Sequence, residues 1–138
     1  MKTSNILVAG LIGGVVAFLL GFLLYGMLLA DFFASHNVTA GVMKTDEQMN
    51  YVPLALGHLA WGLLLAIIFG RWASISTFET GAKAGAVIGL LMSLTVNLIN
   101  LGTANILTTT GHMADIAIVT IVSAIAGGAI AWYLGRGK

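Results

Sequence analysis

The chain has 138 residues, of which 59% are hydrophobic and only 8% charged, and its mean hydropathy is +1.00. Soluble domains carry about 25% charged residues, so this composition excludes a soluble domain as well as a disordered chain. A net charge of +1 excludes a phosphate-binding nucleic-acid surface, and the lack of cysteine excludes disulfides and thiolate metal sites. We therefore expect an integral membrane protein whose first partner is the lipid bilayer.

Four apolar stretches are long enough to cross that bilayer, at about residues 6–30, 51–69, 82–101 and 112–134. Each meets the requirement of ~20 residues for a spanning helix, and none shows the strict alternation of a barrel strand. The sequence predicts an all-α, polytopic fold in which residues 1–138 form a single four-helix transmembrane domain.

Polar residues mark where three of these helices should begin. Asn50 stands three residues before Pro53, Thr77 two residues before Glu79, and three threonines at 108–110 precede the last stretch. Each is a typical helix N-terminus, because short polar side chains cap free backbone N–H groups and acidic groups suit the positive end of the helix dipole.

The distribution of charge predicts the orientation of the chain. On one side of the four stretches the net charge is about +4, and on the other it is about −3. The more positive side holds five of the six cations, with Lys44 alone opposite: Lys2, Arg71, Lys83, Arg136 and Lys138. By the positive-inside rule both termini are cytoplasmic (N-in/C-in), in a multi-pass protein of the cell (inner) membrane.

Small residues recur every four positions within the predicted helices. Such stripes let helix backbones approach closely in lipid, where no hydrophobic force drives association. Two interpretations stay open: packing inside one four-helix bundle, or contact with a second subunit in an oligomer. The glycines expected at these helix contacts are Gly13, Gly21, Gly62, Gly85, Gly89 and Gly127.

A second group of residues is polar and lies at one common depth, toward the outer side. His58 continues the stripe of Gly62, so its ionisable side chain should face protein, where it either bonds to Ser93 or Asn97 or serves a function. His36 and His112 are expected at the membrane interface. Together the group could line an outward-facing pocket for a small ligand or an ion: Tyr25, His58, Ser93, Asn97, Asn100 and Asp115.

The residues give little support for an enzyme. A bis-histidine haem would need two buried histidines at matching depth, retinal would need a lysine in the middle of the membrane, and zinc or carboxylate-dyad catalysis would need clustered ligands. We expect no cofactor, no metal and no catalytic residue.

Three segments resemble a family of small four-helix bacterial membrane proteins classed as a domain of unknown function. They are FLLGFLLYGMLLADFF at 18–33, LGHLAWGLLLAIIFGRWA at 56–73 and SAIAGGAIAWYLGRGK at 123–138. The resemblance implies a bacterial inner-membrane setting and no particular activity.

Two functional hypotheses follow. The first is a structural or accessory subunit, in a homo-oligomer or in a larger assembly with other membrane subunits, suggested by the small-residue stripes. The second is a protein that binds or transports a small ligand or ion through the polar pocket centred on His58. The sequence slightly favours the first, because packing alone accounts for each polar residue.

Overall fold

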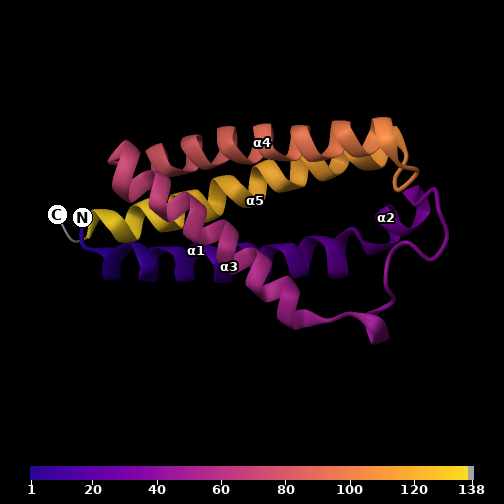
Figure 1. Cartoon of the computed structure of the whole chain (residues 1–138), viewed down its shortest axis with the longest axis horizontal. Coiled ribbons are helices and arrows are strands. Elements are labelled where there is room, and N and C mark those ends of the chain that lie inside the picture. The colour runs from indigo at the N-terminus through magenta and orange to yellow at the C-terminus, as the bar shows by residue number, and fades with distance from the viewer. Residues whose placement is uncertain (137–138) are drawn as a thin grey trace.

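The computed structural model describes residues 1–136, and these fold entirely into helices and loops (Figure 1). The α-helices are α1 (Thr3–Leu23), α2 (Ala30–His36), α3 (Tyr51–Ile67), α4 (Phe78–Thr103) and α5 (Thr109–Gly135). Two π-helical turns, η1 (Leu24–Leu28) and η3 (Ile68–Ala73), extend α1 and α3, and η2 (Asp46–Gln48) is a single 3-10 turn.

Four of the helical segments are long and apolar enough to cross a membrane: Thr3–Leu28, Tyr51–Ala73, Phe78–Thr103 and Thr109–Gly135. The all-helical prediction and its four long apolar helices are therefore confirmed. Each observed segment extends a few residues beyond at least one of its predicted ends. A further short helix, α2, forms in the connection after the first spanning segment.

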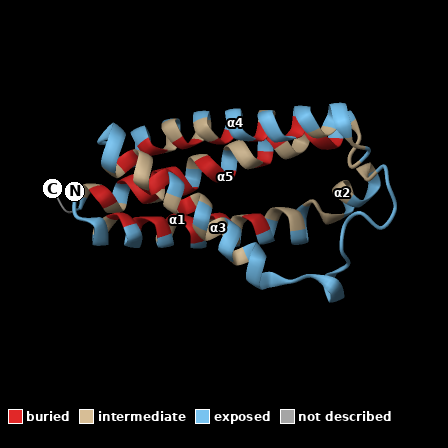
Figure 2. Cartoon of the chain, in the orientation of Figure 1, coloured by how far each residue is buried: buried red, intermediate tan, exposed pale blue. Residues whose placement is uncertain are grey.

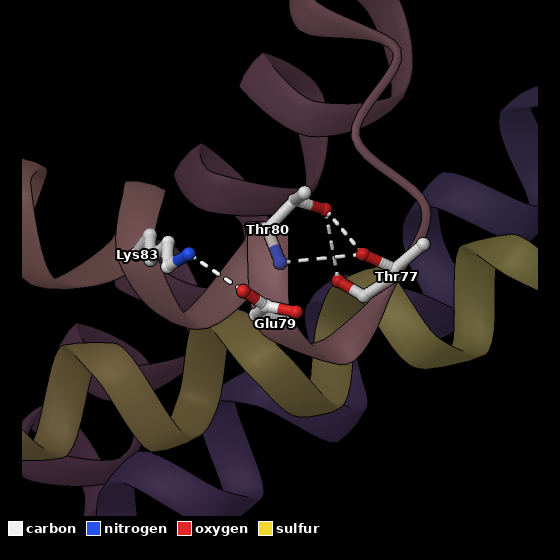
Figure 3. Close-up of polar contacts among 4 residues, drawn as sticks. All are labelled: Thr77, Glu79, Thr80 and Lys83. Atoms are coloured by element: carbon white, nitrogen blue, oxygen red, sulfur yellow. Dashed lines mark hydrogen bonds and ion pairs between the residues drawn. The ribbon is translucent and has the colours of Figure 1, made fainter.

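All three predicted helix starts are confirmed. The Asn50 side chain accepts a hydrogen bond from Val52 N at 3.1 Å, and Thr108 accepts one from Gly111 N at 3.2 Å. Figure 3 shows the third, where Thr77 accepts from Thr80 N at 3.2 Å.

The same figure shows an ion pair one turn further along α4, between Glu79 and Lys83 at 2.6 Å. Both side chains are largely exposed, and such pairs contribute only ~0.3–0.5 kcal/mol. The start of α4 is therefore fixed mainly by its Thr77 cap.

The helices pack as two antiparallel pairs. One pair is α1 with α3, the other is α4 with α5, and α1 packs against α5 to join them, whereas α3 and α4 barely touch. In Figure 1, α3 crosses the bundle obliquely, with its C-terminal end near the start of α4 and its N-terminal end away from the α4–α5 pair.

Backbone-to-backbone contact through glycine closes the pair of α4 and α5. A Cβ atom at Gly85 would lie 2.2 Å from the carbonyl oxygen of Ser123, and one at Gly127 would lie 2.5 Å from that of Gly81. A larger residue at either glycine would collide with main chain, which cannot move aside as a side chain can. At Gly89 a Cβ would lie 2.4 Å from the Cβ of Ser123.

The pair of α1 and α3 is closed in the same way. A Cβ at Gly62 would lie 2.3 Å from both the carbonyl oxygen of Gly10 and the amide nitrogen of Gly14. The remaining predicted glycines also lie inside the chain: Gly13 against Ile130, and Gly21 against the His58 ring. All six predicted packing glycines thus stand at contacts within a single chain.

Buried apolar side chains form two clusters along the bundle. The terminal half, which holds the start of α1 and the end of α5, contains the larger one: Ile6, Ala9, Leu65, Ala66, Phe69, Ile130, Ala131 and Leu134. The loop half, at the other end, contains a smaller one: Ala17, Ile118, Val122 and Ala126. Figure 2 shows buried residues on the inward faces of α1, α4 and α5, and exposed residues over the N-terminal part of α3.

The outward faces of the long helices are apolar. Among the exposed large side chains are Leu19 on α1, Val87 and Leu91 on α4, and Ile121 on α5, each more than half exposed. A contiguous apolar exterior of this kind would promote aggregation in water. It suits a surface covered by lipid.

At the end of the loop half, two loops pair with each other. Val38 N donates to the Ile106 carbonyl and Thr108 N donates to the His36 carbonyl, both at 2.9 Å, around an isolated antiparallel bridge between Asn37 and Leu107. This pairing joins the segment after α2 to the start of α5.

Candidate functional site

A cavity of about 420 Å³ lies in the loop half, where α3 diverges from α4. All four long helices contribute to its wall. Most of the wall is apolar, including Trp61, Val119 and Val122. Its polar members are Tyr25, His58, Ser93, Asn97, Asp115 and Ser123.

Asn97 is the centre of a hydrogen-bonded network in this wall. It is buried on α4, and its Nδ2 donates to Asp115 Oδ2 at 2.7 Å and to the Ser93 carbonyl at 3.0 Å. Its Oδ1 lies 2.7 Å from His112 Nδ1. Because both acceptors beside Nδ2 are oxygens that cannot donate, the amide orientation is fixed, and Oδ1 accepts a hydrogen bond from His112 Nδ1–H.

Asp115 receives the hydrogen bonds of this network. The Tyr25 hydroxyl bonds to Oδ1, and Asn97 donates to Oδ2. Each carboxylate oxygen therefore has a partner able to donate. The carboxyl group is thereby held in one orientation at the cavity wall.

His112 corrects one of the sequence expectations. It was expected at the membrane interface, but it is 2% exposed and lies inside the bundle near the start of α5. The expectation that only His58 would be buried is wrong as well. The two paired loops cover the first turn of α5. A Cβ at the neighbouring Gly111 would lie close to both Leu107 and His36. Since His112 Nδ1 donates to Asn97, the opposite nitrogen, Nε2, is buried without a hydrogen-bond partner among the described residues.

His58 is partly exposed at the wall of the cavity. The sequence suggested a bond to Ser93 or Asn97, but His58 Nδ1 instead donates to the carbonyl of Leu54 in its own helix, at 2.8 Å. The ring packs edge-on against Phe18 with centroids 5.6 Å apart. With Nδ1 as the donor, the neutral ring leaves Nε2 as an acceptor beside Gly21.

Tyr25 reaches the network from the π-helical turn η1. Its ring also contacts Phe33 of α2, with centroids 5.1 Å apart. Widened turns of this type frequently occur at functional sites, because they re-aim side chains within an otherwise regular helix. Here the turn lies opposite Asp115, ninety positions away in the sequence.

Five of the six residues predicted for the pocket line one cavity, namely Tyr25, His58, Ser93, Asn97 and Asp115. The sixth, Asn100, is partly exposed on α4 and lies outside the cavity wall. Its side chain has no hydrogen bond to any described residue. It therefore does not join Asn97, although both stand on the same helix.

Sequence reasoning missed three residues that shape this site. His112 looked interfacial because it stands only four positions after the cap at Thr108. Ser123 was seen only as a small residue of a stripe, yet it lines the cavity with a buried hydroxyl that has no partner among the described residues. Gly57 also lines the cavity, and a Cβ there would meet no atom within 4 Å.

Comparison with known proteins gives no further guide: no family model, no curated protein and no solved structure matches the chain. The resemblance to a bacterial family of unknown function therefore stays a prediction.

Proposed function

We propose that this protein is a multi-pass membrane protein that binds a small amphipathic molecule in the cavity between its four long helices. The single observation that carries the proposal is the cavity itself, whose wall is mostly apolar but holds a fixed hydrogen-bond network around Asp115. Apolar pockets with a few convergent polar groups are typical of small-molecule sites.

The size of the cavity supports a small organic ligand. Ligand sites generally enclose about 300–1,000 Å³, and this cavity measures about 420 Å³. An isolated inorganic ion would leave most of that space empty, which is costly next to apolar side chains. A molecule with one polar end and an apolar body fits both the volume and the wall.

The mouth of the cavity lies between α3 and α4. Leu54 on α3 and Met92 and Val96 on α4 line the cavity and are 38%, 46% and 52% exposed. These side chains belong to two of the candidate membrane spans. We therefore propose that the ligand enters sideways, from the lipid.

The orientation that we propose places both termini on the cytoplasmic side of the cell (inner) membrane. Arg71 donates to Thr3 at 2.6 Å, so the end of η3 lies beside the start of α1. Arg136 and Lys83 are at this same end of the bundle, and Lys44 is in the long loop at the other end. Lys138, which was counted with them, lies outside the described residues.

The alternative role, as a structural or accessory subunit that self-associates or joins other membrane proteins, was suggested by the glycine stripes. Because the six glycines make contacts inside one chain, no described surface now favours that role over ligand binding.

Native mass spectrometry on protein extracted gently from its own membrane tests the proposal. We expect a reproducible bound mass on the wild type. The Gly57→Leu variant should lose it, since the new side chain extends into open space at the cavity wall without colliding with the fold. Gly102→Leu is the matched control: a Cβ there also meets nothing within 4 Å, but Gly102 lies outside the cavity.

Two results would contradict the proposal. One is a wild type that carries no bound mass beyond bulk membrane lipid. The other is a bound mass that both variants retain equally. Co-extraction with other protein chains at fixed stoichiometry would instead support the subunit hypothesis.

A further inference from the structure

From the charge and the hydrogen-bond character of the cavity wall, we infer that the ligand carries a positively charged ammonium group that pairs with Asp115. This inference rests on the proposed function and names its ligand class.

Among the described residues, the cavity wall carries one formal negative charge and no positive one: Asp115 is the only acidic residue that lines it, and no described Lys or Arg does. Among the described residues the ion pair that forms is Glu79 with Lys83, remote from the cavity. A carboxylate within a membrane-spanning helix is costly unless it is paired. In this protein the missing partner is a cation.

The hydrogen bonds already made by Asp115 leave room for that cation. An ionised carboxylate offers about four lone-pair sites, and Tyr25 and Asn97 occupy one on each oxygen. These two donors hold the carboxylate in a fixed orientation at the cavity wall. Its other lone pairs are unused by described side chains.

The rest of the polar wall also selects a hydrogen-bond donor. His58 Nδ1 is committed to the Leu54 carbonyl, so Nε2 of the neutral ring accepts. A primary ammonium, with three N–H donors, can use the free lone pairs of Asp115, whereas a carboxylate or phosphate ligand would face Asp115 with like charge.

The apolar part of the wall fits the body of such a ligand. Ser123 lies two turns deeper than Asp115 on α5, roughly 12 Å by helical rise. Between these depths α5 presents Val119 and Val122, and Trp61 of α3 also lines the cavity. An ammonium group above an alkyl or aromatic body can therefore contact Asp115 while its body lies against these side chains.

Three probes of the same length separate charge from shape: n-decylammonium, n-decanol and n-decanoate. Their binding is measured on the protein in nanodiscs of zwitterionic lipid, with empty nanodiscs as the baseline. We expect the wild type to bind decylammonium at least tenfold more tightly than decanol, and decanoate more weakly than both. The Asp115→Asn variant should bring decylammonium within threefold of decanol and leave decanol unchanged.

Glu79→Gln is the matched control, because it removes an exposed carboxylate from the far end of the bundle. It should keep the preference for decylammonium. If Asp115→Asn does not fold, the ranking of the three probes on the wild type still decides.

Equal binding of decylammonium and decanol, or tighter binding of decanoate, would overturn the ammonium inference while the cavity remained a ligand site. An Asp115→Asn variant that folds and keeps the full preference would overturn it too. If none of the probes binds above the baseline, and no bound mass is found on the native protein, the proposed function itself fails.

Discussion

The same four helices are packed in two different ways along their length. In the terminal half, glycine lets backbones touch and a fully buried apolar core closes the bundle. In the loop half, α3 leaves α4, the apolar cluster is smaller, and buried polar groups surround a cavity. Close helix packing closes one half of the bundle, and the buried polar groups surround the space that it leaves open in the other half.

The difference has a physical cause. Small residues allow close approach only where they face one another, and Gly62 meets Gly10 and Gly14 near the middle of α1 and α3. Toward the start of α3 the residues at the cavity wall are larger, such as His58 and Trp61. The network around Asn97 joins α4 and α5 to η1 in this half.

The largest effect should come from disrupting the close packing of α4 against α5 with Gly85→Leu. Its Cβ would lie 2.2 Å from the Ser123 carbonyl oxygen, so the two helices must separate. We expect the free energy of unfolding in mixed detergent micelles to fall by about 3 kcal/mol or more. Gly102→Leu, which adds the same side chain in open space, should change it by less than about 1 kcal/mol. Equal stability of the two variants would contradict the view that this glycine contact stabilises the packing of α4 against α5.

An intermediate effect is expected from removing the centre of the polar network. Asn97→Leu leaves both Asp115 and His112 without a partner that they now have. We expect a loss of about 2 kcal/mol in the same unfolding assay. Asn100→Leu is the control on the same helix, and it should be nearly neutral because Asn100 bonds no described side chain. Similar losses for the two asparagines would show that the network adds nothing.

The smallest effect is expected at Ser123. Its hydroxyl is buried and has no hydrogen-bond partner among the described residues, so Ser123→Ala should leave stability unchanged or raise it by up to about 1 kcal/mol. In the decylammonium titration the same variant should leave binding nearly unchanged, because Ser123 lies two turns from Asp115, beside the alkyl body of the probe. A clear loss of stability would indicate that the hydroxyl has a structural partner.

Much of the fold could be predicted because lipid imposes simple rules. Long apolar runs, the caps at Asn50, Thr77 and Thr108, and the four-residue spacing of glycine are all local patterns. The set of residues around the cavity was also largely foreseen, since shared depth follows from counting residues along antiparallel helices. Five of the six predicted pocket residues line the cavity.

The features that the sequence did not predict depend on the rotation of each helix about its axis and on contacts between distant loops. Asn97 and Asn100 lie within one turn of each other, and the direction in which α5 faces decides which of them meets Asp115. The burial of His112 depends on the pairing of residues 36–38 with 106–108, a contact between distant loops that no local pattern marks. The π-helical turn that carries Tyr25 shows no sequence signal that we recognise.

The entry that we propose between Leu54, Met92 and Val96 changes how affinity for this protein must be measured. A ligand that arrives through lipid is present there at its membrane concentration, which for an amphiphile is far above its concentration in water. The number of lipids per protein in a nanodisc or vesicle therefore sets the apparent dissociation constant. Titrations at two lipid-to-protein ratios should give the same dissociation constant when the ligand is expressed as a mole fraction in the bilayer. They should give different constants when it is expressed per litre of buffer.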